Sequence, residues 1–93
     1  MKRDRRGFLL EVTYRGGQPW AAYLQLPGNS GQRAYCSRRE ERGLIVDLAR
    51  DGKPLGIEIT APGLVSLTAV NRLLKRLGAP TITKADFGPL LAA

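Results

Sequence analysis

Two carboxylates, Asp47 and Glu58, are the side chains of this sequence whose spacing could serve a chemical function. They lie on either side of Asp51-Gly52, a dipeptide that favours a two-residue β-hairpin turn with positive φ at both positions. In the hairpin that this turn predicts, Asp47 faces Gly56, and Glu58 lies diagonally about 7–8 Å away on the same sheet face. A glycine inside a strand lets another group approach the backbone. The two acids are therefore a candidate polar site for a cation or an arginine, and the alternative is a solvated sheet face.

The same segment partly matches a calcium-binding loop, with Asp47, Asp51, Gly52 and Glu58 at loop positions 1, 5, 6 and 12. Position 3, however, is Ala49, which has no ligating side-chain atom. In the predicted hairpin Asp51 and Glu58 would also lie roughly 20 Å apart, because a strand advances about 3.3 Å per residue. We therefore expect no calcium site and no cofactor.

The side chains of common catalytic arrangements are missing. The sequence contains no histidine, one cysteine (Cys36), no phosphate-binding loop and no zinc-ligand spacing. Cys36 has no histidine to activate it and is expected to be a small strand residue. A hydrolytic pair of carboxylates would need a cleft and two separated pKa values, and the sequence indicates neither. We predict that the protein is not an enzyme.

The net charge of +7 comes from 15 basic and 8 acidic residues. Such an excess attracts polyanions, either nucleic acid or an acidic protein. Arg72, Lys75 and Arg76 share one face of a predicted helix and are candidate phosphate contacts, although a solvated helix face is the alternative. Four aromatic side chains could stack on bases, and their spacing fits core and strand-surface positions equally well: Tyr14, Trp20, Tyr23 and Tyr35.

Alternating apolar and polar residues predict the strands that precede the hairpin. Residues 8–14 predict a half-buried strand, and residues 20–26 predict a second, with Trp20 among its inward side chains. Residues 33–38 predict a weaker strand whose charges suit the edge of a sheet, and residues 39–42 predict a turn.

The hairpin itself brings six aliphatic side chains to one face of the sheet. We expect the pairs Leu44–Ile59, Val46–Ile57 and Leu48–Leu55, because side chains alternate along a strand. A slip of one residue would bury the two acids in their place, so the register is tightly specified.

A helix and an apolar tail follow the sheet. Ser66 is a good N-cap for an amphipathic helix over residues 66–77, and Gly78 and Pro80 end it. Residues 83–86 could cap a short further turn. The tail, residues 80–93, docks either on its own sheet or on a partner through four candidate contacts: Ile82, Phe87, Leu90 and Leu91.

Together these elements predict one domain of the α+β class over residues 1–93. Residues 1–7 are a basic arm, and residues 8–60 form an antiparallel β-meander of four to five strands. One C-terminal amphipathic helix, residues 66–77, packs on one face of this sheet, and the apolar tail follows.

Four segments between residues 12 and 60 form a pattern: Tyr23-Leu24-Gln25-Leu26, Val46-Asp47, Asp51-Gly52 and Gly56-Ile57-Glu58-Ile59. The pattern resembles a family of short bacterial proteins, the domain-of-unknown-function family twenty-two eighty-three. This resemblance implies a compact antiparallel sheet with a helical C-terminus and no established activity. It suggests an antitoxin-like or accessory partner. The chain has Ala49 where the family commonly has an acid.

Two functional hypotheses follow. The first is a non-catalytic protein-interaction module that uses an exposed strand edge or the apolar tail, with a protein partner or a second copy of the chain. The alternative is a basic nucleic-acid-binding accessory protein. No apolar run approaches the roughly 18 residues of a membrane helix, and one cysteine fits a reducing cytosol. We therefore expect a cytoplasmic protein without membrane association.

Overall fold

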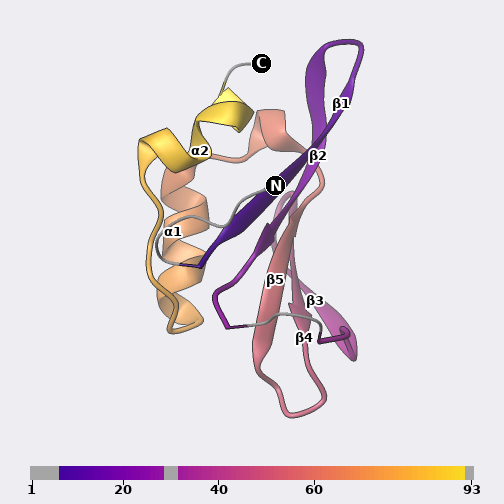
Figure 1. Cartoon of the computed structure of the whole chain (residues 1–93), viewed down its shortest axis with the longest axis vertical. Coiled ribbons are helices and arrows are strands. Elements are labelled where there is room, and N and C mark those ends of the chain that lie inside the picture. The colour runs from indigo at the N-terminus through magenta and orange to yellow at the C-terminus, as the bar shows by residue number, and fades with distance from the viewer. Residues whose placement is uncertain (1–6, 29–31, 92–93) are drawn as a thin grey trace.

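The computed structural model describes residues 7–28 and 32–91, which form a five-stranded antiparallel sheet with helices against one face (Figure 1). The class is therefore α+β. The predicted basic arm lies outside the described residues except for Gly7. The strands are β1 (Leu9–Arg15), β2 (Gln18–Gln25), β3 (Cys36–Glu41), β4 (Leu44–Leu48) and β5 (Pro54–Ile59); the helices are η1 (Pro62–Leu64, a 3₁₀ turn), α1 (Leu67–Arg76) and α2 (Lys84–Leu91).

The strand order is β1-β2-β5-β4-β3, so the predicted meander is wrong. β5 lies between β2 and β4, and β3 lies at the edge beyond β4. Burial explains this order. The core-side residues of β5 are almost fully buried, whereas β3 has four charged side chains and is mostly exposed. The apolar strand therefore takes the centre and the charged strand takes the edge. β3 also continues through Glu41 and includes much of the predicted turn at residues 39–42.

The central hairpin, β4 and β5, largely has the predicted register. Leu44 pairs with Ile59 and Val46 with Ile57, but an irregularity after Asp47 pairs Leu48 with Pro54 in place of Leu55.

The turn of this hairpin differs from the predicted one. The Ala49 amide donates to Lys53 O (2.8 Å), and the Gly52 amide donates to Ala49 O (2.9 Å). Within this loop Gly52 is the one residue with positive φ (89°), since none of the described non-glycine residues has a positive φ. This three-residue loop places a glycine at its one left-handed position, whereas a two-residue turn would also strain Asp51.

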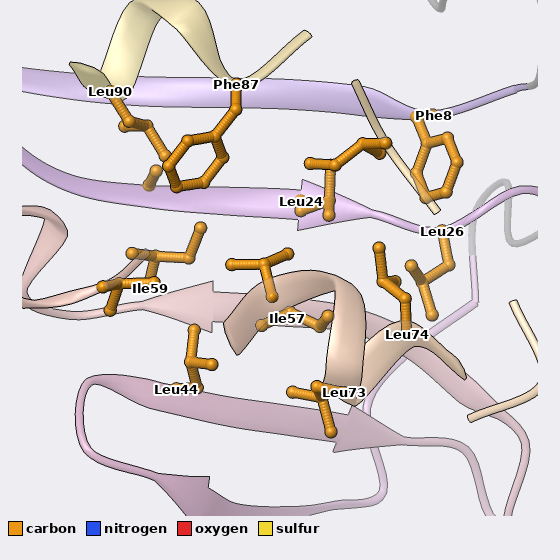
Figure 2. Packing of buried hydrophobic residues seen from close by; sticks show 14 of the residues in the cluster. Phe8, Leu24, Leu26, Leu44, Ile57, Ile59, Leu73, Leu74, Phe87 and Leu90 are labelled. Atoms are coloured by element: carbon orange, nitrogen blue, oxygen red, sulfur yellow. The ribbon is translucent and has the colours of Figure 1, made fainter. Parts of the chain in front are cut away.

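The helices and the inner face of the sheet enclose the hydrophobic core (Figure 2). α1 contributes three fully buried side chains, Val70, Leu73 and Leu74. Ser66 caps α1 as predicted, since its Oγ accepts from the Ala69 amide at 3.1 Å. The strands, the residues next to them and the tail provide most of the other large buried side chains: Phe8, Leu24, Leu26, Leu44, Val46, Leu55, Ile57, Ile59, Val65, Ile82, Phe87 and Leu90.

The tail docks on its own domain and forms a second helix, so the prediction of a single C-terminal helix is wrong. Asn71 of α1 holds the tail in place: its Nδ2 donates to Ile82 O (3.0 Å), and its Oδ1 accepts from the Ile82 amide (2.8 Å). A capping box then starts α2, because the Thr83 amide donates to Asp86 Oδ2 (2.9 Å) and the Asp86 amide donates to Thr83 Oγ1 (3.2 Å).

The β1–β2 hairpin extends past the end of β5 (Figure 1), because only Ala22 to Gln25 of β2 pair with β5. Thr13 pairs with Ala21 and Tyr14 with Pro19, so Trp20 is the extra residue of a bulge in β2. Trp20 is consequently 53% exposed. The prediction that its side chain points into the core is therefore wrong. The guanidinium of Arg15 lies 4.4 Å from the centre of its ring.

Candidate functional site

The sheet face away from the helices carries polar side chains from all five strands. We call this surface the open face. Its polar residues are Glu11 and Thr13 of β1, Tyr23 and Gln25 of β2, Glu58 of β5, Asp47 of β4, and Ser37 and Arg39 of β3; Gly56 and Ile45 lie among them.

Asp47 and Glu58 are neighbours on the open face, in the arrangement that the sequence predicts. Asp47 pairs with Gly56, and Glu58 pairs with Tyr23 on one side and Ile45 on the other. The alternative of a solvated sheet face is wrong for Asp47, because only 9% of this residue is exposed. The carboxylate is covered by side chains from the neighbouring strands.

Tyr23 lies beside Asp47, and Gly56 makes the position of the tyrosine ring possible. A Cβ atom at residue 56 would lie 2.1 Å from the Tyr23 hydroxyl oxygen and 2.3 Å from Cζ. The tyrosine ring therefore rests directly on the glycine backbone. The sequence indicated that something approaches Gly56, but it did not identify Tyr23, because the predicted meander did not place β2 beside β5.

Asp47 is the centre of a hydrogen-bond network on the open face. Its Oδ1 accepts from Ser37 Oγ at 2.7 Å. Its carboxylate also accepts from the Tyr23 hydroxyl and shares a hydrogen bond with Glu58. Three strands thus contribute partners to one buried acid, which satisfies the rule that buried charges need hydrogen bonds.

The network raises the pKa of two side chains, Glu58 and Tyr23. The hydrogen bond to Asp47 raises the pKa of Glu58 above its usual value, with smaller contributions from desolvation and from the charge of Asp47. Burial raises the pKa of Tyr23 to about 12, and the charge and hydrogen bond of Asp47 add to this effect, followed by the charges of Glu58 and Glu11. A hydrogen bond and a negative charge from the neighbouring acid both favour the protonated form of Glu58, which explains the direction of its shift.

A shallow depression of about 410 Å³ borders this cluster, with Thr13, Tyr23, Asp47, Glu58 and Thr60 as its polar lining. Within residues 7–28 and 32–91 no group of three or more acidic or cysteine side chains is placed to hold a metal ion. What the cluster does show is one buried acid with hydrogen-bond partners on neighbouring strands, and a raised pKa for Glu58 and Tyr23.

The three predicted phosphate contacts lie on α1, beside β3. Arg72 Nη1 is 2.9 Å from Glu41 Oε1, and Arg76 Nη2 is 3.6 Å from Glu40 Oε1. Lys75 is exposed. Two of the three cations are thus paired with acids of the neighbouring strand, and their charge is partly neutralised.

The four predicted partner contacts of the tail have mostly become core. Ile82, Phe87 and Leu90 are 5%, 1% and 3% exposed. Leu91 ends α2, and its side chain lies outside the described part of the chain.

The two edges of the sheet differ in their protection. At the β3 edge, charged side chains form ion pairs with one another and with α1. At the β1 edge, no described strand pairs with the outer side. The core-side residues Leu10 and Val12 are only half buried, and Tyr14 is 55% exposed. β1 is therefore the sheet edge with apolar side chains left partly uncovered.

No family model, curated protein or solved structure matched the chain. The resemblance to the domain-of-unknown-function family twenty-two eighty-three consequently stays a prediction. Among the described residues, no helix is long and apolar enough to cross a membrane.

Proposed function

We propose that the protein is a non-catalytic interaction module whose β1 edge binds a strand of a protein partner. The observation that carries this proposal is that no strand of residues 7–28 and 32–91 pairs with the outer side of β1, whose apolar side chains are only half buried. An added strand would form main-chain hydrogen bonds with β1 and cover Leu10, Val12 and Tyr14. The role as an antitoxin-like or accessory partner and the cytoplasmic location belong to the same proposal.

The other surfaces of the protein are less suited to binding a partner, which supports the proposal for β1. Ile82, Phe87 and Leu90 would have to leave the core to reach a partner, and each buried side chain of this size contributes about 1.5–3 kcal/mol. Two acids of the open face, Asp47 and Glu58, are engaged with each other and with Ser37 and Tyr23. Of the two sheet edges, β3 carries the charges that natural proteins use against strand addition.

A matched pair of variants tests the proposal. Tyr14→Lys places a charge on the β1 edge, and Tyr35→Lys makes the same change beside β3; both tyrosines are more than half exposed, so both variants should stay folded. We expect partners from an extract of the protein's own cells to be retained by wild type and Tyr35→Lys but lost by Tyr14→Lys. Amides of residues 9–15 should exchange more slowly in the bound protein. Equal retention by both variants, or unchanged exchange in β1, would contradict the proposal.

Nucleic-acid binding is the second candidate function. A cluster formed by Tyr35, just before β3, and Arg50, in the β4–β5 loop, favours it. The guanidinium of Arg50 lies 4.8 Å from the ring centre of Tyr35, which is 61% exposed. A depression of about 390 Å³ lies beside them, and its charged lining consists of Arg33, Arg50 and Asp51. An exposed aromatic ring among cations is typical of single-strand binding.

Salt dependence distinguishes this candidate from the first. Binding of a single-stranded oligonucleotide should weaken steeply with salt, and Tyr35→Lys should remove the stacking contribution while Tyr14→Lys should not. If no oligonucleotide binds at about 50 mM salt, nucleic-acid binding is ruled out as the function.

A further inference from the structure

We propose that the strand received by the β1 edge comes from a second copy of this chain, antiparallel about a two-fold axis at Thr13. This inference rests on the proposed function and adds the occupant and the register. A two-fold axis requires a surface that is complementary to itself. The exposed half of β1 has this property.

An axis at Thr13 produces three kinds of cross-strand pair. Thr13 faces Thr13 of the second copy, Val12 faces the second copy's Tyr14, and Glu11 faces the second copy's Arg15. Hydroxyl pairs, β-branched–aromatic pairs and opposite-charge pairs are each favourable across antiparallel strands. The symmetry repeats the last two kinds, so every pair from Glu11 to Arg15 is favourable.

The neighbouring register is less complementary. An axis at Val12 would place Leu9 opposite the second copy's Arg15 and Glu11 opposite its Thr13, so neither charge would have a directly opposed partner. It would also bring Glu11 of the two copies into diagonal positions, where like charges repel. Charge complementarity therefore selects the axis at Thr13.

The structure prepares β1 for this pairing. The extra residue of the bulge, Trp20, belongs to β2, so β1 itself has no inserted residue. Arg15 is exposed and its guanidinium is held over the Trp20 ring, which reduces the side-chain freedom lost on pairing with an acid. On the core side, Val12 and Tyr14 would cover each other across the new interface.

Charge reversal supplies a test in which two variants complement each other. Glu11→Arg places Arg opposite Arg at both symmetric positions, and Arg15→Glu places Glu opposite Glu. Each variant alone should dimerise roughly tenfold more weakly than wild type, or worse. In an equal mixture, however, every opposed pair is again Arg with Glu, so a heterodimer should form.

Sedimentation over about 1 µM to about 1 mM protein measures these states, with wild type approaching twice the 10.2 kDa chain mass. Circular dichroism confirms the fold of each variant, and recovery of the dimer on mixing excludes misfolding as the cause of the loss. A monomeric wild type overturns the inference. So does a dimer that is indifferent to either charge reversal.

The variants distinguish a wrong occupant of the β1 edge from a β1 edge that binds nothing. If wild type is monomeric while Tyr14→Lys still loses a partner that Tyr35→Lys retains, the second copy is the wrong occupant and the β1 edge remains the binding surface. If Tyr14→Lys changes neither self-association nor partner binding, the β1 edge is not a binding surface.

Discussion

The covered face and the open face of one sheet are stabilised by different interactions. On the covered face, apolar side chains from the strands, α1 and α2 are buried together (Figure 2). On the open face, a single buried carboxylate, Asp47, is satisfied by groups from the neighbouring strands. Burial of apolar area depends little on pH or salt, whereas the protonation of Glu58 and Tyr23 depends directly on pH. The same strands therefore have one face whose stability changes little with pH and one face whose stability depends on pH.

Truncation of the covered face should have the largest effect. Phe87 of α2 is 1% exposed, so Phe87→Ala should lower the free energy of unfolding by about 3–5 kcal/mol. Chemical denaturation measures this change. Leu64→Ala is the control, since Leu64 is 63% exposed and its truncation should cost less than about 0.5 kcal/mol. A similar, small effect at both sites would mean that α2 does not contribute to the core.

On the open face, the strongest effect should come from adding a single methyl group. Gly56→Ala would push Tyr23 off its position over the backbone and remove a hydrogen bond from Asp47, at a cost of about 2–3 kcal/mol. Gly63→Ala is the matched control, because no atom lies within 4 Å of the added Cβ.

A double-mutant cycle then identifies the cause. If the clash with Tyr23 is responsible, Tyr23→Ala should relieve part of the cost of Gly56→Ala, and the two changes should be less than additive. Strict additivity would show that the loss has another origin.

These two faces also differ in how far the sequence predicted them. The covered face follows from local patterns: alternation set the pairs Leu44–Ile59 and Val46–Ile57, and the spacing of α1 with its cap at Ser66 set the helix. For the second helix the sequence predicted the cap at residues 83–86 but only a short turn after it. Gly88 and Pro89 lower the intrinsic propensity of this helix, while burial of Phe87 stabilises it.

The open face depends on which strands are neighbours, and local patterns do not contain that information. The proximity of Asp47 and Glu58 was predicted because both lie in one hairpin. The contribution of Tyr23 was not, since it requires β2 beside β5. The signal that could have located it was the interior glycine, Gly56, combined with the observation that charged β3 would not tolerate a central position.

Titration of Tyr23 should affect stability at alkaline pH. Its pKa is raised from 10.0 to about 12 in the folded protein, so the folded state keeps a proton that the unfolded state loses. Stability from this source is fully present below pH 10 and falls as the pH rises toward 12, by on the order of 1 kcal/mol once solvent screening of the half-exposed ring is included. The difference in ultraviolet absorbance between wild type and Tyr23→Phe reports this residue alone. A midpoint near 10 would contradict burial against Asp47.

Glu58 should produce a smaller dependence in the acidic range. Its folded pKa is raised, so its contribution to stability is complete below the unfolded pKa and is lost as the pH rises through the folded value. Denaturation of wild type between about pH 4 and pH 8 should therefore show a decline that Glu58→Gln removes. The control is Glu11→Gln, at an exposed position on the same face. Identical pH profiles for wild type and Glu58→Gln would contradict the raised pKa of Glu58.

The smallest effect is expected at the β3 edge, where ion pairs are exposed. Arg72→Ala removes the 2.9 Å contact with Glu41, yet both side chains are partly solvated, so the loss should be about 0.2–1 kcal/mol and should shrink in about 1 M salt. A cycle with Glu41→Gln isolates the pair. If the coupling is this small, the charges of β3 add little to folding, and their effect lies in deterring strand addition. Removing them should then make β3 resemble β1, with slower amide exchange in residues 36–41 at high protein concentration than at low concentration.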